Sequence, residues 1–207
     1  TCWYRIRRGL GEKMINNTEA VKLLNSKRDD SVIVATMNAG NARFGLPTVS
    51  SNDSLDVPLS GAMGKAGNFA LGVALANPDR KVMCLDGDGS LLMNLGTMVT
   101  VANKSVKNMY HFVFDNGAYC VTGGQPVPGA GILDWKAMGD AAGYAASFSF
   151  ENLEDLVTGI DEVFSTEGPV FIRLAVDKEV ENTPVQYRER PRRTMKDAII
   201  ELPKALS

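Results

Sequence analysis

Two short polar motifs hold the residues of this sequence that are best suited to chemistry. The first is DGDGS (86–90), which directly follows the apolar run 81–85. The second is DNG (115–117), which directly follows the apolar run 109–114. Glycine lets the backbone turn sharply and approach a ligand closely, and Asp88 stands between two glycines. Its carboxylate is therefore a candidate ligand for a cation or a candidate cap of a tight turn.

Two familiar Asp–Gly patterns do not fit the first motif. An EF-hand calcium loop beginning at Asp86 requires Gly at its sixth position and Glu at its twelfth, and the sequence has Leu91 and Thr97 there. A dinucleotide fingerprint, G-x-G-x-x-G, requires a third glycine, and the sequence has Leu92 at that position. The motif therefore belongs to neither class.

Two interpretations remain open on the residues alone. One is a tight strand-to-helix turn with a capping acid. The other is a magnesium–diphosphate site, in which Gly87 and Gly89 allow an anion to approach and Ser90 opens a helix whose free N–H groups favour phosphate oxygens. Magnesium prefers an oxygen shell that protein groups fill only in part. Asp88 would then need a second ligand from a neighbouring strand end, where Asn116 stands.

The elements around these motifs alternate between strand and helix. Strands are predicted at 31–37, 81–85, 109–114, 144–150 and 169–176, with a short one around 55–59, and helices at 18–27, 63–76, 90–104, 134–142 and 152–164. The strands are nearly continuous apolar runs, which is typical of a parallel sheet covered by helices on both faces. This pattern predicts a doubly wound α/β domain that binds ligands beyond the carboxyl ends of its strands. The segment 115–132 is expected to be a long loop, and the tail from 177 to wrap a surface.

The composition narrows the class of protein. The chain has 207 residues, enough for one sizeable α/β domain, and its formal net charge of −2 gives no support to nucleic-acid binding. Its three cysteines are unclustered, which favours a reducing compartment, and no apolar run approaches the ~20 residues of a membrane span. We expect a cytoplasmic protein with a flexible N-terminal extension at 1–13, a domain at 14–180, and a tail at 181–207 that packs on the domain or on a partner.

Together the two motifs resemble the binding motif for thiamine diphosphate (ThDP), which is written as GDG followed about 25 residues later by NN. Here GDG (87–89) is followed after 25 residues by Asp115 and Asn116, so Asp115 replaces the first Asn. The resemblance implies that Asp88, Asn116 and the backbone carbonyl of Ala118 hold Mg²⁺.

The segment 60–82 resembles the stretch that precedes this motif in ThDP-dependent decarboxylases and synthases. By that resemblance, the Gly61 carbonyl accepts a hydrogen bond from the aminopyrimidine, and Met63 is the wedge that bends the cofactor into a V shape. That shape brings the amine beside thiazolium C2, where it serves as an intramolecular base. Without this context, Met63 would be interpreted as a core methionine. The implied cofactor-binding residues all lie in 14–180, the expected pyrophosphate-binding domain: Gly61, Met63, Gly87, Asp88, Gly89, Ser90, Asn116 and Ala118.

Two further stretches narrow the resemblance. NARFG (41–45) and NGAYCVTGGQP (116–126) are similar to phosphonopyruvate decarboxylase and to the β subunit of sulfopyruvate decarboxylase, and the similarity runs from about residue 18 to residue 176. As a rule, phosphonopyruvate decarboxylase carries a pyrimidine-binding domain in the same chain, and this sequence has no room for one. The resemblance therefore implies a β subunit that works with a separate α subunit in a hetero-oligomer.

The implied activity is that of a lyase that decarboxylates a small anionic 2-oxo acid, with 3-sulfopyruvate, converted to sulfoacetaldehyde and CO₂, as the favoured substrate. The family's catalytic glutamate belongs to the pyrimidine-binding domain, so no catalytic residue is assigned in this chain. Alone, the chain is expected to bind ThDP weakly and to turn over nothing. Phosphonopyruvate decarboxylase, or a subunit of another ThDP enzyme acting on a 2-oxo acid, remains an alternative. So does a non-catalytic ThDP-binding subunit that serves assembly.

The second anion of such a substrate needs donors, and several residues are candidates. Arg43 matches a basic residue of the family, although a solvated loop arginine fits the sequence equally well. The loop formed by Thr122, Gly123, Gly124 and Gln125 matches the family's loop over the site. His111, the only histidine, lies within a predicted strand and is expected to be structural. Cys120 lies in the loop, but nothing near it in the sequence marks it as a nucleophile.

Overall fold

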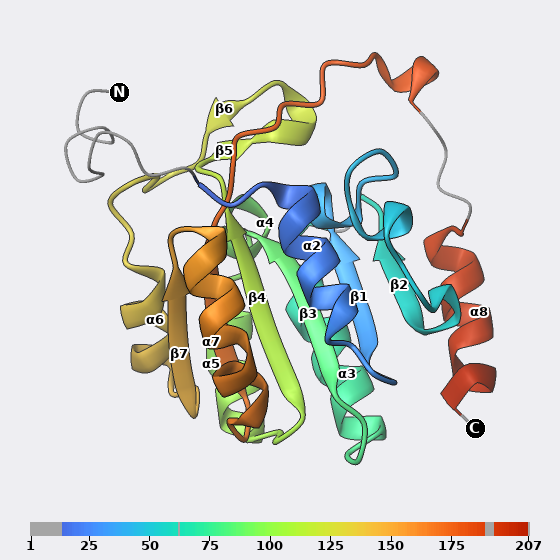
Figure 1. Ribbon diagram of the computed structural model, residues 1–207, viewed down its shortest axis with the longest axis vertical. Helices are drawn as coiled ribbons and strands as arrows, with labels where there is room; N and C mark the ends of the chain where they lie inside the picture. Colours follow the sequence, from blue (N-terminus) through green and yellow to red (C-terminus); the bar gives the residue numbers. More distant parts are fainter. Residues whose placement is uncertain (1–13, 62, 189–192, 207) are drawn as a thin grey trace.

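A six-stranded sheet in which all strands run parallel passes through the centre of the structure (Figure 1). The computed structural model describes residues 14–61, 63–188 and 193–206, and the expected extension at 1–13 lies outside them. In spatial order the strands are β2 (Asp56–Leu59), β1 (Val32–Thr36), β3 (Val82–Gly87), β4 (Met109–Asp115), β8 (Val170–Ala175) and β7 (Ala146–Phe150).

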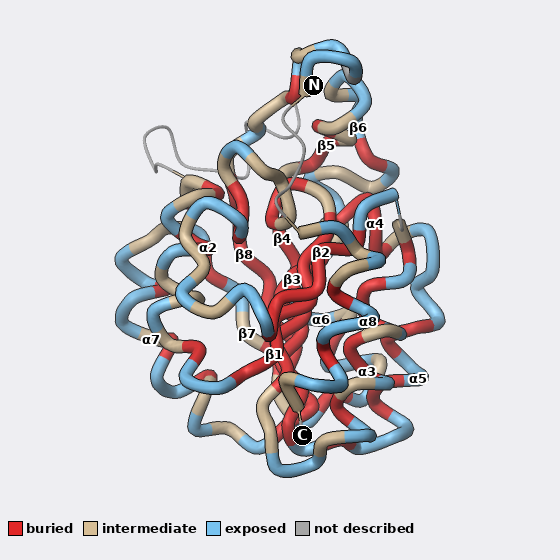
Figure 2. Tube along the Cα trace, turned by 90° about the vertical axis from the view of Figure 1, so that its right-hand side faces the viewer, coloured by how far each residue is buried: buried red, intermediate tan, exposed pale blue. Residues whose placement is uncertain are grey.

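Helices cover both faces of this sheet. One face carries α2 (Asn17–Ser26) and α7 (Leu153–Ser165), and the other carries α3 (Ala66–Ala76), α5 (Gly96–Lys104), α6 (Trp135–Ala142) and α8 (Met195–Leu206), so the buried strands lie between two helical layers (Figure 2). In β1, Val32 and Val34 face one core, and Ile33 and Ala35 face the other. Because both faces are buried, the strands are apolar throughout, and the predicted doubly wound α/β domain is confirmed. None of the helices in the described part of the chain is long and apolar enough to cross a membrane.

The direction of the strand order reverses at β1. From β1 the chain passes first to β2 on one side and then to β3 on the other. The carboxyl ends of β1 and β3 therefore flank a switch point, which is where doubly wound sheets bind their ligands.

The single helix predicted at 90–104 is wrong. The structure has two helices, α4 (Asp88–Leu92) and α5, with a turn at 93–95 between them. The side-chain amide of Asn94 donates to the Gly64 carbonyl at 3.0 Å, and such side-chain bonds compete with helix continuation. Gly96 at the start of α5 further lowers the local helix propensity. Ser90 therefore does not open the helix, because α4 already begins at Asp88.

Regular structure also occurs in the segment 115–132, which is predicted to be a long loop, and in the tail, for which no helix or strand is predicted. Within 115–132, β5 (Ala118–Tyr119) and β6 (Gln125–Pro126) form an antiparallel hairpin around a 3-10 turn. The tail contains α8, whose Ala198 and Leu202 are buried in the core beside β2. Both are formed by packing against distant segments, and a local pattern of residues does not reveal such packing.

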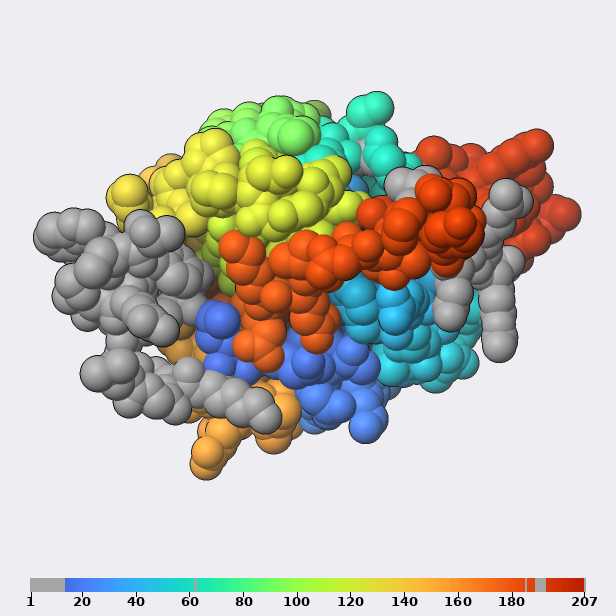
Figure 3. Space-filling view, turned by 90° about the horizontal axis from the view of Figure 1, so that it is seen from above, coloured from blue at the N-terminus to red at the C-terminus, as the bar shows by residue number. Residues whose placement is uncertain are grey.

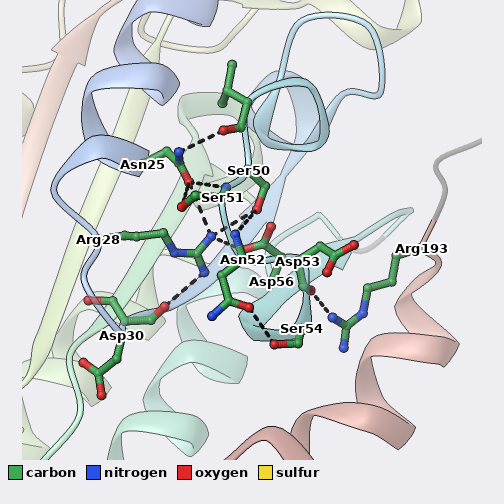
Figure 4. Close-up of polar contacts among 12 residues, drawn as sticks. Asn25, Arg28, Asp30, Ser50, Ser51, Asn52, Asp53, Ser54, Asp56 and Arg193 are labelled. Atoms are coloured by element: carbon green, nitrogen blue, oxygen red, sulfur yellow. Dashed lines mark hydrogen bonds and ion pairs between the residues drawn. The ribbon is translucent and has the colours of Figure 1, made fainter.

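A buried ion pair joins the segment after α2 to the edge strand β2 (Figure 4). Arg28 Nη1 lies 2.8 Å from Asp56 Oδ1, and both side chains are almost fully buried. Arg28 also donates to Ser50 Oγ at 3.1 Å. On the other side, Arg193, which precedes α8, donates to the Asp53 carbonyl. This network holds the loop between β1 and β2 in place.

Candidate functional site

A small cavity lies at the switch point, next to the β5–β6 hairpin. Its walls include 36–39 after β1, 86–90 at the end of β3, Asn116 and 118–122 after β4, and Met63. Its volume is ≈ 40 Å³, and it adjoins a second hollow of ≈ 180 Å³ with which it shares wall residues. Both sequence motifs therefore face one crevice.

Asp88 is the best-fixed side chain in this cavity. It is buried, and each of its carboxylate oxygens accepts one backbone hydrogen bond: Oδ1 from Gly89 N–H and Oδ2 from Gly117 N–H, both at 2.8 Å. Asn116 Oδ1 accepts from the Ala118 N–H at 2.9 Å. The end of β3 and the end of β4 thus bring several oxygen atoms together. Oxygen atoms are the ligands that a hard divalent cation such as Mg²⁺ prefers.

The Asp88 carboxyl group holds its proton more tightly than an ordinary aspartate does. Burial, and after it the negative charge of Asp115, raise the pKa of Asp88 to about 7, although the two backbone hydrogen bonds lower it. A bound cation would place a positive charge beside the Asp88 carboxylate and favour its charged form.

Arg173 on β8 is a site residue that the sequence reasoning missed. Its Nε and Nη2 donate to Asp115 Oδ2 at 2.9 and 2.7 Å, and both side chains are buried. The available signal was an arginine inside the apolar strand, since a buried charge requires a partner.

The two glycines of the DGDGS motif serve different purposes. A Cβ at Gly89 would lie 2.6 Å from the Tyr119 ring, so this glycine allows the hairpin to pack on α4. A Cβ at Gly87 would lie in ordinary van der Waals contact with Met37 at 3.7 Å, and Gly87 lines the cavity. Ser90 is buried, and its Oγ accepts from the Gly64 N–H at 3.1 Å, which ties α4 to the segment that carries Met63.

Met63 and Gly61 lie on the same rim of the crevice. Met63 is half-buried and lines the cavity, so it is not a core methionine. Gly61 lines the adjoining hollow with a φ of +62°, a backbone conformation that favours glycine.

Arg43 lies in the adjoining hollow together with Arg188, which the sequence reasoning did not single out. Arg43 is half exposed, donates to Thr183 Oγ1 at 2.8 Å and lies 3.6 Å from Glu181 Oε1. Arg188 donates to two backbone carbonyls, those of Thr183 and Val121. The tail that carries Thr183 and Glu181 is orange in Figure 3. It crosses this end of the molecule between the yellow-green hairpin region and the blue segment near the N-terminus.

The four candidate loop residues divide into two groups. Thr122 lines the cavity. Gly123, Gly124 and Gln125 form the turn of the hairpin, where Gln125 Nε2 donates to the Thr122 carbonyl at 3.0 Å, and they line neither hollow. The two glycines have φ values of +114° and +79°, so this tight turn needs glycine.

Asn38 is a second cavity residue that the sequence reasoning missed. Its Nδ2 donates to the Glu179 carbonyl at 3.1 Å, whereas its buried Oδ1 has no hydrogen-bond partner. The preceding Met37 also lines the cavity and has a φ of +51°, which is strained for a residue with a side chain. An unsatisfied acceptor and a strained backbone at the end of β1 are typical of a ligand-binding site.

The remaining titratable groups near the cavity belong to the core. His111 is fully buried and pairs through Nδ1 with the Tyr144 hydroxyl at 2.9 Å. Its Nε2, the Asp86 carboxylate and the Cys84 thiol lie within 4.8 Å of one another, but all three side chains are fully buried. Burial raises the pKa of Cys84 well above its usual range, and that of Cys120 to about 11. Both therefore remain thiols at neutral pH, a poor state for a nucleophile.

Comparison with known proteins connects this crevice to a cofactor family. The family described as thiamine pyrophosphate enzymes, C-terminal TPP binding domain, matches residues 36–174. Phosphonopyruvate decarboxylase of Streptomyces viridochromogenes is 37% identical over 155 residues, and the β subunit of sulfopyruvate decarboxylase of Methanothermobacter thermautotrophicus is 30% identical over 176 residues. A crystal structure assigned to a thiamin diphosphate-dependent enzyme from Mycobacterium smegmatis has the same fold, with a TM-score of 0.65 at 21% identity over 79% of this chain and 32% of the other.

This chain covers a different share of the length of each relative. The match takes up 75% of this chain but only 38% of the Streptomyces viridochromogenes decarboxylase, and a similar decarboxylase of Streptomyces hygroscopicus is covered over 28% of its length. The Methanothermobacter β subunit is covered over 88% of its length, by 83% of this chain. The chain thus corresponds to a part of the first two relatives and to most of the third.

Proposed function

Because this chain belongs to the family of thiamine pyrophosphate enzymes, as their C-terminal TPP-binding domain, we propose that it holds ThDP through a Mg²⁺ ion at the switch point. Asp88, Asn116 and the Ala118 carbonyl would be the metal ligands. The observation that carries the proposal is the link between the two motifs, because Gly117 N–H donates to Asp88 Oδ2 at 2.8 Å. That bond places the Asp88 carboxylate of the first motif beside the Gly117 backbone amide of the second motif.

The other cofactor-binding residues follow from their positions. Gly87, Gly89 and Ser90 would surround the diphosphate, Met63 would support the bent cofactor, and the Gly61 carbonyl would face its aminopyrimidine. When bound, ThDP supplies the electron sink for decarboxylation of a 2-oxo acid. The residues of this chain orient the cofactor and keep water from one side of it.

The proposed substrate is a 2-oxo acid with a second anionic group, 3-sulfopyruvate before phosphonopyruvate. Both substrates are proposed because the chain is similar to a β subunit of sulfopyruvate decarboxylase and to a phosphonopyruvate decarboxylase, at 30% and 37% identity. The hollow that Arg43 shares with Arg188 supports an anionic group, since Glu181 offsets only one of the two charges. Thr122 would cover the substrate from the other side, and Gly123, Gly124 and Gln125 would contribute only by shaping the hairpin that carries it.

A partner subunit is part of the proposal. Ligand pockets usually measure about 300–1,000 Å³, and the two hollows here measure ≈ 40 and ≈ 180 Å³. This chain would therefore form one wall of the cofactor site, and an α subunit with the pyrimidine-binding domain would form the other and supply the catalytic glutamate. A non-catalytic assembly subunit is the second candidate function, because no group of this chain is assigned to proton transfer.

We also propose 14–180 as the pyrophosphate-binding domain and the cytoplasm as the compartment. The compartment is supported by Cys84 and Cys120, which are both free thiols.

Reconstitution tests the function directly. The chain is purified alone and with the product of the neighbouring reading frame, and CO₂ release is measured from sulfopyruvate, phosphonopyruvate and pyruvate. We expect no turnover by the lone chain, and the highest kcat/KM of the complex with sulfopyruvate. Robust decarboxylation by the lone chain would contradict the need for a partner. A complex that binds ThDP and decarboxylates none of the three would favour the assembly subunit.

A further inference from the structure

The ion pair between Asp115 and Arg173 has a role beyond the proposed cofactor contacts. Asp115 stands immediately before the proposed metal ligand Asn116, at the position where the resembled motif has an uncharged asparagine. Its carboxylate is buried near that of Asp88. Two neighbouring buried carboxylates repel each other, so an aspartate at this position needs a counter-charge.

Arg173 supplies that charge from the neighbouring strand. The two strands pair so that Arg173 lies opposite Val113, and the guanidinium reaches two residues along β4 to Asp115. Nε and Nη2 both donate to one oxygen, Oδ2, at 2.9 and 2.7 Å. A guanidinium fork of this kind fixes orientation as well as charge.

Arg173 is itself anchored on its far side. Its Nη1 donates to Ser149 Oγ at 3.3 Å and to the carboxylate of Glu151. The backbone adds a further tie, because Val176 N–H donates to the Asp115 carbonyl at 3.1 Å. The end of β4 is thus held to β8 and β7, away from the cavity.

We infer that Arg173 is a positioning residue for the cation site: by neutralising and orienting Asp115, it fixes the end of β4 so that Asn116 and Gly117 meet Asp88. The inference rests on the proposed cofactor site. It adds that the aspartate in the second motif and the arginine in β8 depend on each other, so that loss of the arginine is harmful only while the aspartate is present.

The test is a double-mutant cycle on the chain reconstituted with its partner subunit, read by electron paramagnetic resonance as Mn²⁺ binding in the presence of ThDP, with Mn²⁺ and ThDP without protein as the blank. Arg173→Met should weaken Mn²⁺ binding about 10–100-fold, as loss of a residue that orients a metal ligand does. Asp115→Asn should bind within about threefold of the wild type, and Asp115→Asn/Arg173→Met should recover at least tenfold over Arg173→Met. Lys136→Met, which removes the cation of an exposed ion pair with Asp140, is the control for the loss of a positive charge and should bind normally.

Either of two results would overturn this inference and leave the proposed cofactor site standing. One is an Arg173→Met variant that binds Mn²⁺ as tightly as the wild type. The other is a double variant that binds Mn²⁺ no more tightly than Arg173→Met. If circular dichroism shows that Arg173→Met does not fold, the double variant is compared with Asp115→Asn instead. The inference then requires that these two variants bind Mn²⁺ with the same affinity. A wild-type complex of the chain with its partner subunit that binds no Mn²⁺ at millimolar concentration with ThDP would instead refute the proposed cation site, and the inference with it.

Discussion

At the scale of the residue, Asp88 combines two properties that matter for a metal site. Backbone amides hold both carboxylate oxygens, so the side chain has one orientation before any ligand arrives. Burial and the neighbouring Asp115 disfavour its charged form. A divalent cation relieves that cost, so the same burial that makes the free carboxylate unfavourable makes the site selective for positive charge.

The pKa of Asp88 makes cation binding depend on pH near neutrality. In the proposed site Mg²⁺ would bind the carboxylate form, and the pKa of Asp88 is about 7 in the metal-free chain. The proton competes as the pH falls, so the apparent Mg²⁺ affinity should drop about twofold from pH 8 to 7 and about fivefold from pH 7 to 6. Calorimetric titration with Mg²⁺ and ThDP at pH 6, 7 and 8 measures this, and a constant affinity would contradict it.

The same group affects the stability of the metal-free chain. The folded-state pKa is raised above the ordinary value of 3.8, so between the two pKa values the folded state binds more protons than the unfolded state. The contribution of Asp88 to the free energy of unfolding therefore decreases as pH rises from about 4 to 7. Asp88→Asn should remove that contribution from the pH profile of urea unfolding.

At the scale of the element, the edge strand β2 depends on a buried ion pair. It is the outermost strand, and the Arg28–Asp56 pair ties it to the segment after α2. α8 covers it on the other face. Because β2 and the loop before it form part of the adjoining hollow, their position also determines the shape of the crevice.

Removing one partner of this pair should be costly. Arg28→Met leaves Asp56 buried without its counter-charge, and such changes cost about 3–5 kcal/mol in the free energy of unfolding. Lys27→Met is the matched control, because Lys27 pairs with Asp161 at the exposed surface, where a pair contributes about 1 kcal/mol or less. Chemical denaturation of both variants measures the difference, and equal losses would contradict the importance of burial.

At the scale of the whole molecule, the site joins segments that are far apart in the chain. Residues after β1, at the end of β3 and after β4 meet at the switch point, and a tail segment beyond residue 176 crosses beside them. A ligand bound there contacts several elements at once, so binding is coupled to the stability of the entire fold.

That coupling is measurable as a thermal shift. At a ligand concentration of 100 times Kd, binding adds about 2.7 kcal/mol, which corresponds to a rise in Tm of roughly 5–10 °C for a domain of this size. Differential scanning fluorimetry with Mg²⁺ and ThDP together should show this rise for the wild type. Asp88→Asn should show none, and an equal shift in that variant would place the ligand elsewhere.

Local pattern was sufficient for most of the elements and insufficient for three features of the fold. Continuous apolar runs predict β1, β3, β4 and β8, because a strand buried on both faces has no polar side. The break between α4 and α5 escapes such reasoning, since it depends on Asn94 bonding to Gly64, thirty residues away. The β5–β6 hairpin and α8 likewise depend on contacts with distant segments.

The sequence by itself determined the class of fold, the family and the two motifs whose residues face one crevice, because these depend on residue type and spacing along the chain. Only the tertiary structure decided that Gly117 N–H meets Asp88, that Arg173 pairs with Asp115 and that Asn38 Oδ1 is left without a partner. Charge balance and hydrogen-bond satisfaction are properties of neighbours in space, and strand order alone makes β8 the neighbour of β4. The motif predicts a cation site, and the fold determines which residues lie next to that proposed site.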